Sequence, residues 1–183
     1  MRSIFAWAAT ALFALSISAA QAQTIESTPA PAPKKPDLTG LSFLQGTWSC
    51  WYKSSRRPSV GKFTVTYAPD ATGFWLVGKS SSPGVSWFPY PSKSVDMITY
   101  DRDSGRYVDS FTDTQGNYDL STSKGWVGKK FTWHSLAFMP GPDIISVTDQ
   151  TWTKVSATKL TSYSGFTTKK GRKVTVTGGC TKS

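Results

Sequence analysis

The sequence predicts an all-β fold, a single antiparallel up-and-down β-barrel of about ten strands. Apolar and polar residues alternate over short segments: in residues 61–69, Phe63, Val65 and Tyr67 share one face and Thr64 and Thr66 the other. Gly, Pro, Asp and Ser interrupt these segments. Aromatic residues occur in nearly every segment, as the core or lined cavity of one barrel requires, and closure removes exposed sheet edges. A sandwich is the alternative.

The expected strands follow one another through mostly tight turns, and no segment has a convincing helical pattern. They are residues 46–53, 61–69, 74–80, 95–100, 106–112, 117–123, 129–136, 143–153, 159–166 and 173–180. Longer connections join 80 to 95 and 136 to 143, and both contain Pro.

The two ends of the chain differ in composition from the strand-rich part. Arg2, an apolar run from Ile4 to Ile17 and Ala20-Gln21-Ala22 predict a signal peptide over residues 1–22, and therefore a periplasmic or secreted protein. Residues 23–38 contain four prolines and few large apolar residues, so we expect a disordered linker. Residues 39–183 then form the barrel domain.

The two cysteines, Cys50 and Cys180, predict a disulfide. They lie near the start of the first expected strand and the end of the last, which are neighbours in a closed barrel with an even number of strands. An exported chain favours their oxidation over two free thiols, and two cysteines without a nearby His are too few for a zinc site.

The charge of the protein favours anionic partners. The net charge is +10, and residues 39–183 contain Asp but no Glu. Phosphate-bearing polymers, acidic lipids and nucleic acid all fit this balance, although an exported protein rarely meets nucleic acid. No segment after the signal peptide is apolar enough to span a membrane as a helix.

The chain resembles the calycin superfamily, which includes lipocalins, fatty-acid-binding proteins and nitrobindin-like barrels. The resemblance rests on "LQGTW" at the first strand and on "YAPDATGFWLVG", "DMITYDRDSGRYVDSFTDTQGNY" and "TWTKVSATKL", which are similar to a family of uncharacterised exported bacterial domains. It implies a barrel that binds small hydrophobic molecules. Nitrobindin-like proteins bind haem through a late histidine, whereas His134 lies mid-domain, so haem is not expected. Lys182 is a possible substitute for the Arg that accompanies the lipocalin tryptophan.

Strand order predicts two unlike barrel ends, because alternate turns share an end. Trp48 and the cysteines lie towards one end, where Trp48 is expected to act as a plug. The other end collects basic and aromatic residues that we interpret as a ligand portal. They are Arg56, Arg57, Trp87, Phe88, Tyr90, Phe138, Met139, Lys169, Lys170 and Arg172, with Lys173 beside them. The alternative is that these loops simply pack on their own barrel.

Candidate polar groups inside the barrel are Asp109 and Asp149, each of which alternates with apolar residues. An inward carboxylate needs a partner, either a ligand or an internal Tyr or Lys. Ser135 follows His134 directly and faces the other side of its strand, so a serine–histidine hydrolase is not expected. No metal-ligand spacing or phosphate-binding glycine loop is present.

These observations favour a binding protein for a small hydrophobic or amphipathic ligand, with an anionic ligand favoured by the charge of the protein, and without predicted catalysis. One alternative is an interaction protein that places its basic and aromatic rim on anionic envelope polymers or lipid heads. Another is a hydrolase or isomerase that uses an inward Asp, which a strongly raised pKa inside a wet cavity would support.

Overall fold

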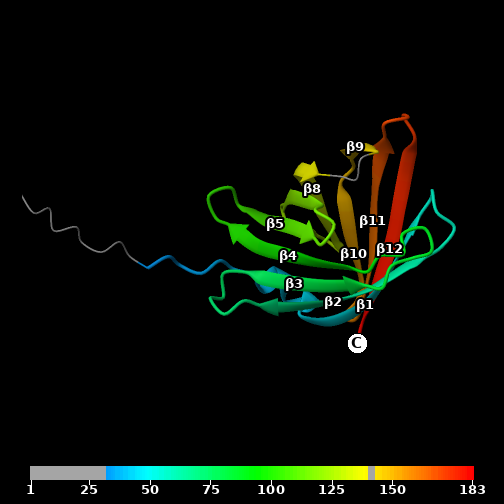
Figure 1. Ribbon diagram of the computed structural model, residues 1–183. Helices are drawn as coiled ribbons and strands as arrows, with labels where there is room; N and C mark the ends of the chain where they lie inside the picture. The colour runs from blue at the N-terminus through cyan, green and yellow to red at the C-terminus, as the bar shows by residue number, and fades with distance from the viewer. Residues whose placement is uncertain (1–31, 140–142) are drawn as a thin grey trace, which may run out of the picture. The chain divides into compact units, whose positions relative to one another are not determined.

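The computed structural model describes residues 32–139 and 143–183, and Lys34–Ser183 form one compact unit. The predicted signal peptide and most of the predicted linker lie outside the described residues, and residues 32–38 contain no helix or strand. Ten strands build the barrel (Figure 1). They are β1 (Gly46–Ser54), β2 (Gly61–Pro69), β3 (Leu76–Ser82), β4 (Ser92–Asp101), β5 (Arg106–Asp113), β6 (Tyr118–Ser123), β8 (Lys130–Met139), β10 (Gln150–Ser156), β11 (Lys159–Thr168) and β12 (Lys173–Lys182).

The sheet closes on itself through antiparallel pairs. Each strand pairs with its neighbours in the chain, β1 pairs with both β2 and β12, and β8 pairs with β10. Two short strands lie at its margins: β7 (Trp126–Val127) pairs with β8, and β9 (Ile144–Val147) pairs with β11. The predicted closed all-β barrel is therefore confirmed, and closure leaves no long unpaired edge on the ten strands.

The predicted disulfide joins the first and last strands. Cys50 and Cys180 are direct partners in the β1–β12 register, with their Cα atoms 4.1 Å apart. The even number of barrel strands makes β1 and β12 antiparallel neighbours, which is why residues separated by 130 positions meet. The disulfide is consistent with an oxidising compartment.

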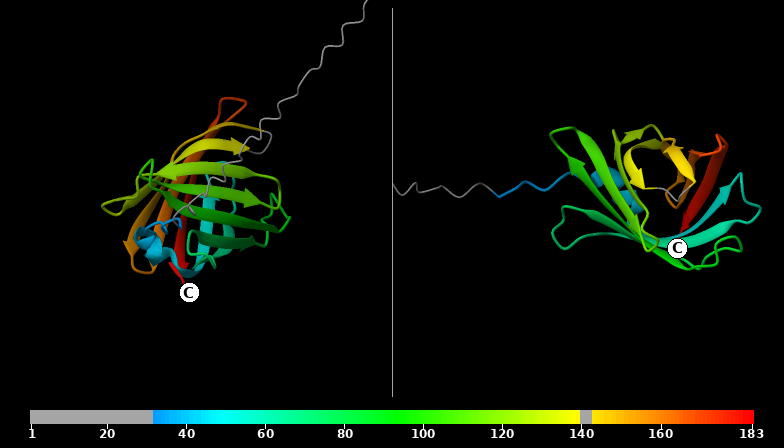
Figure 2. Two further views of the ribbon diagram at one scale, coloured as in Figure 1. Left: turned by 90° about the vertical axis from the view of Figure 1, so that its left-hand side faces the viewer. Right: turned by 45° about the horizontal axis from the view of Figure 1, so that its top comes forward.

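One end of the barrel is closed by a helix that the sequence did not reveal. The 3₁₀-helix η1 (Thr39–Leu44) carries Leu41 and Leu44, which are almost completely buried. Figure 2 (left) shows η1, in blue, at the same end as the β10–β11 turn. The sequence has no convincing helical pattern at these positions, because a helix of six residues is too short to show a helical period.

Trp48 lies directly under η1. Its indole Nε1 donates a hydrogen bond of 2.6 Å to the carbonyl oxygen of Leu44, and its ring meets Phe43 edge to face. Lys182 places its Nζ 5.2 Å from the Trp48 ring and donates to the Phe43 carbonyl oxygen at 3.0 Å. Trp48 therefore belongs to the closed end, where η1 forms the outer part of the plug and Lys182 lies over the tryptophan.

Candidate ligand-binding site

The barrel interior is filled only in part. Aromatic and aliphatic side chains pack tightly near η1, where Phe131, Trp133 and Trp152 contact one another. Beyond this cluster the interior contains two adjoining cavities of about 330 and 340 Å³. Both volumes lie in the range of small-molecule sites.

The inner cavity is the one next to the closed end. Its walls are mainly apolar and aromatic, with several polar groups between them. It is lined by Leu44, Trp48, Phe63, Val65, Tyr67, Ser80, Ser94, Asp96, Asp109, Phe111, Asp119, Gln150, Trp152, Leu160, Ser162 and Cys180. The face of β2 predicted from its alternation, with Phe63, Val65 and Tyr67, is the face that lines this cavity.

The outer cavity reaches the rim and shares Phe111, Asp119 and Gln150 with the inner one. Phe138, Met139 and Ile144 contribute to its wall on the rim side. Because three side chains line both cavities, the two cavities form one site with two parts.

Three carboxyl groups face this interior from neighbouring strands. The predicted inward position of Asp109 on β5 is confirmed, since its residue is 7% exposed and lines the inner cavity. Asp96 on β4 and Asp119 on β6 are both register partners of Phe111, so they lie on either side of it. Asp109 is one inward position along β5 from Phe111 and therefore lies diagonally from both.

The enclosure changes the ionisation of two of these carboxyls. Burial raises the pKa of Asp109 well above its usual range, and the nearby charges of Asp96 and Asp119 raise it further. Burial also raises the pKa of Asp96 to about 7, although a hydrogen bond from Tyr67 opposes the rise. The site thus contains groups that can hold a proton near neutral pH.

A glycine allows the contact between Tyr67 and Asp96. Both residues are register partners of Gly78, which lies between them on β3. A Cβ added at Gly78 would lie 2.3 Å from Cε1 of Tyr67 and 3.0 Å from Oδ2 of Asp96. The missing side chain therefore makes room for the Tyr67 ring to cross β3 and reach the carboxyl group.

Asp119 is held by two serines. The hydroxyl of Ser121 donates to its Oδ2 at 2.8 Å, and the hydroxyl of Ser135 donates to its Oδ1. The Ser135 side chain lines the outer cavity, whereas His134 does not line either cavity. This geometry agrees with the expectation that the two residues face opposite sides of β8.

The predicted inward position of Asp149 is wrong. Its side chain is 53% exposed, lines neither cavity, and pairs with His134, with 2.9 Å between Oδ2 and Nδ1. The reason is a break between β9 and β10: the alternation that includes Ile145 and Val147 does not continue across residues 148 and 149. Gln150, the first residue of β10, faces the interior instead.

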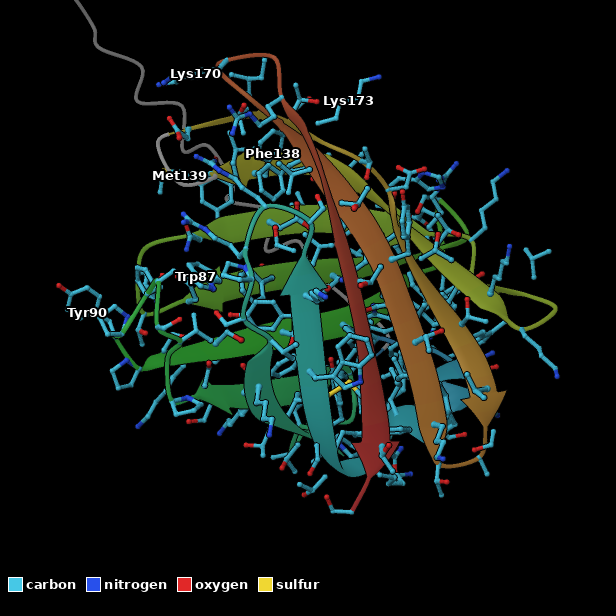
Figure 3. The ribbon with its side chains drawn as sticks, turned by 90° about the vertical axis from the view of Figure 1, so that its right-hand side faces the viewer. Trp87, Tyr90, Phe138, Met139, Lys170 and Lys173 are labelled. Atoms are coloured by element: carbon cyan, nitrogen blue, oxygen red, sulfur yellow. A yellow bond between two sulfur atoms is a disulfide. The ribbon has the colours of Figure 1, made fainter. Side chains whose placement is uncertain are left out.

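The predicted portal residues all belong to connections or strand ends at the open end of the barrel. Figure 3 labels five of them, Trp87, Tyr90, Phe138, Met139 and Lys170. Of the ten predicted portal residues, Phe138 and Met139 alone line the outer cavity, and none lines the inner one. In the β3–β4 connection, Phe88 contacts both Trp87 and Tyr90, and Arg57 lies over the Trp87 ring at 4.9 Å. These aromatic residues thus contact one another and Arg57, while Tyr90 stays 67% exposed.

The basic residues of the rim point to solvent. Lys169, Lys170 and Arg172 are exposed in the β11–β12 turn. Arg56 lies 3.7 Å from Asp143, which ties the β1–β2 turn to the segment before β9. The structure thus brings the predicted cations together at one end, but none of them lines the inner or outer cavity.

In residues 32–139 and 143–183, no helix has the length and apolar character needed to cross a membrane. Nor do three or more His, Cys, Asp or Glu side chains in these ranges come together as a metal site would require.

Comparisons with known proteins give structural likenesses alone. No protein-family model and no curated protein matches the sequence. The chain is similar to the structure of EF1p2_mFAP2b bound to DFHBI, at 12% identity and a TM-score of 0.41, over 79% of this chain and 97% of that one. It is also similar to a protein of unknown function from the DUF3598 family of Nostoc punctiforme, at 13% identity and a TM-score of 0.37. That match covers 84% of this chain and 53% of the other, so this chain spans about half the length of that protein. No statement about function follows from likenesses of this size.

Proposed function

We propose that this protein is an exported binding protein for a small hydrophobic or amphipathic molecule. The observation that carries the proposal is the pair of adjoining cavities inside a closed barrel, together about the size of a typical small-molecule site. Aromatic walls supply apolar contact area, and a few inward polar groups supply orientation. Export rests on the predicted signal peptide and is supported by the Cys50–Cys180 disulfide.

The polar and apolar parts of such a ligand would meet different environments. An anionic head, which the composition favours, would find Lys and Arg side chains only outside the two cavities, at the rim. The apolar part would occupy the inner cavity among Phe63, Phe111 and Trp152. This arrangement supports an amphipathic ligand that lies along the barrel axis.

The experiment measures the affinity of the folded protein for a neutral fluorescent probe, N-phenyl-1-naphthylamine. In addition, native mass spectrometry of protein purified from its own host detects any molecule that stays bound. The variant Gln150→Trp puts an indole where the cavities meet, so we expect its probe affinity to fall at least about tenfold through lost cavity volume.

The matched control is Thr151→Trp, which adds the same side chain to the next residue of β10. Thr151 faces outwards, where its hydroxyl lies 3.3 Å from that of Thr132. We expect Thr151→Trp to bind the probe like the unchanged protein. Equal affinity of all three proteins, or no probe binding at all, would contradict the proposal.

One observation favours a second candidate, an isomerase or hydrolase. The raised pKa of Asp109 inside a cavity is typical of a group that transfers protons. The test is to incubate a ligand that binds with the protein in D₂O and to analyse the recovered ligand by mass spectrometry. Catalysis would be supported if the wild-type protein introduces deuterium into the ligand or changes its mass and Asp109→Asn does not. A ligand recovered unchanged from the wild-type protein would exclude catalysis on that ligand.

A further inference from the structure

The described residues that line the inner cavity include acidic side chains but no basic ones. The acidic side chains of this wall are Tyr67, Asp96, Asp109 and Asp119, from β2, β4, β5 and β6. The described residues that η1, β1, β3, β10, β11 and β12 contribute to the lining include no Lys, Arg or His. Although the net charge of the protein is +10, the charged side chains among the described residues of this cavity wall are carboxyl groups alone.

One of these carboxyls lacks a partner on one oxygen. Asp119 is held by two serines and Asp96 by Tyr67, whereas no hydrogen-bond partner reaches Oδ1 of Asp109 among the described residues. The backbone N–H of Ser110 donates a hydrogen bond to the carboxyl group of Asp109. A buried polar atom without a partner is costly, and a ligand that donates a hydrogen bond would remove this cost.

The surrounding walls suit an organic cation. Phe111 lies between Asp96 and Asp119 in the register, and Phe63 and Trp152 line the same cavity. Aromatic faces attract ammonium groups, and the attraction strengthens when water is excluded. The three carboxyls do not form a metal-binding group, so an inorganic ion is not the favoured occupant.

We propose that the inner cavity binds the protonated amine of an aromatic or hydrophobic ligand, with Asp109 as the hydrogen-bond acceptor and Asp96 and Asp119 as flanking charges. This inference rests on the proposed binding function and names its ligand class. It places the polar group at the inner end of the site, whereas the charge of the whole protein favours an anionic group at the rim. The ammonium group supplies the donor and the positive charge that the cavity lacks.

The test compares three probes of similar size with different charge: 2-(1-naphthyl)ethylamine, 2-(1-naphthyl)ethanol and 1-naphthylacetic acid. Their affinities for the folded, disulfide-bonded protein are measured by isothermal titration calorimetry at pH 8. We expect the amine to bind about 10- to 100-fold more tightly than the alcohol, as a charged hydrogen bond in an enclosed site allows. The acid should bind more weakly than the alcohol.

The variant Asp109→Asn keeps the shape of the side chain but removes its charge. We expect it to bind the alcohol as before and to lose most of the preference for the amine. The control Asp103→Asn makes the same change in the exposed β4–β5 turn and should keep the full preference. Retained alcohol binding also shows that Asp109→Asn is folded, and Asp96→Asn gives a second variant with the same expectation.

The pH dependence gives an independent measurement. Binding of a cation favours ionised carboxyls, whose pKa values are raised in the empty site, so amine affinity should rise between pH 5.5 and 8. The alcohol should show no such rise.

Equal binding of amine and alcohol, or tighter binding of the acid, would overturn the amine inference while the binding function stands. Failure of all three probes and of N-phenyl-1-naphthylamine would overturn the binding function itself, and the inference with it.

Discussion

The two ends of the barrel use their side chains differently. At the closed end, η1, Trp48 and the Cys50–Cys180 disulfide surround an almost fully buried core. At the open end, the turns carry exposed Lys and Arg, and the interior next to them contains the outer cavity. Buried apolar contacts therefore gather at one end, whereas the rest of the interior keeps unfilled volume and inward carboxyl groups. Four variants test this division.

The largest effect is expected from the disulfide. Replacing both cysteines, Cys50→Ser and Cys180→Ser, frees a loop of 130 residues in the unfolded chain and should lower the free energy of unfolding by about 4–5 kcal/mol. Urea unfolding measures the loss, and the reduced wild-type protein should match the variant. A loss below about 1 kcal/mol would show that the β1–β12 pairing is sufficient without the bond.

The plug should contribute nearly as much. Leu41→Ala removes a side chain with no exposed surface and should cost about 3 kcal/mol. The control at the open end is Ile145→Ala on β9, where the side chain is 56% exposed, and its cost should stay below about 1 kcal/mol. Both values come from urea unfolding, and equal costs would remove the distinction between the two ends.

The carboxyls should make stability depend on pH. Because the pKa of Asp96 is higher in the folded protein than in the unfolded chain, its contribution favours folding at low pH and is lost as pH rises from about 4 through about 7. Asp96→Asn removes this loss, so at pH 8.5 the variant should be more stable than wild type by on the order of 2 kcal/mol.

The difference in stability between Asp96→Asn and the wild-type protein should shrink towards pH 4. Thermal unfolding between pH 4 and 8.5 measures this difference, and Asp103→Asn serves as the exposed control. A constant difference at every pH would show that Asp96 is not buried as the structure indicates.

The smallest effect on stability is expected at the rim. The triple variant Lys169→Gln, Lys170→Gln and Arg172→Gln changes exposed side chains, so the free energy of unfolding should stay within about 0.5 kcal/mol per site. Binding of N-phenyl-1-naphthylamine should also be unchanged. Cosedimentation with phosphatidylglycerol vesicles at low salt should decrease, because these cations attract an anionic surface. Unchanged cosedimentation would remove the rim as an anion-binding surface.

Much of the fold follows from local pattern. The alternation in β2 predicted its inward face, and the positions of the two cysteines predicted the disulfide. Strand order predicted which turns share the open end. These features are readable because each depends on a strand period of two and on the parity of antiparallel neighbours.

Hydrophobic alternation predicted less of the candidate site. In β4 both faces carry apolar residues, with Val95 and Met97 on one and Ile98 on the other, so the alternation does not show that Asp96 faces inwards. In β6 the pattern misleads, because the apolar residue Leu120 is exposed while Asp119 faces the cavity. Hydrophobic alternation assumes an apolar interior, and here the interior is partly polar.

The sequence by itself determined the closed barrel, the bond between its first and last strands, and the separation of a plugged end from a basic rim. Local residue patterns and parity encode all of these. Only the tertiary structure decided that η1 closes the barrel, that Gly78 lets Tyr67 reach Asp96, and that Asp109 rather than Asp149 faces the cavity. These features depend on contacts between strands and on where one strand ends, which no single segment of the chain specifies.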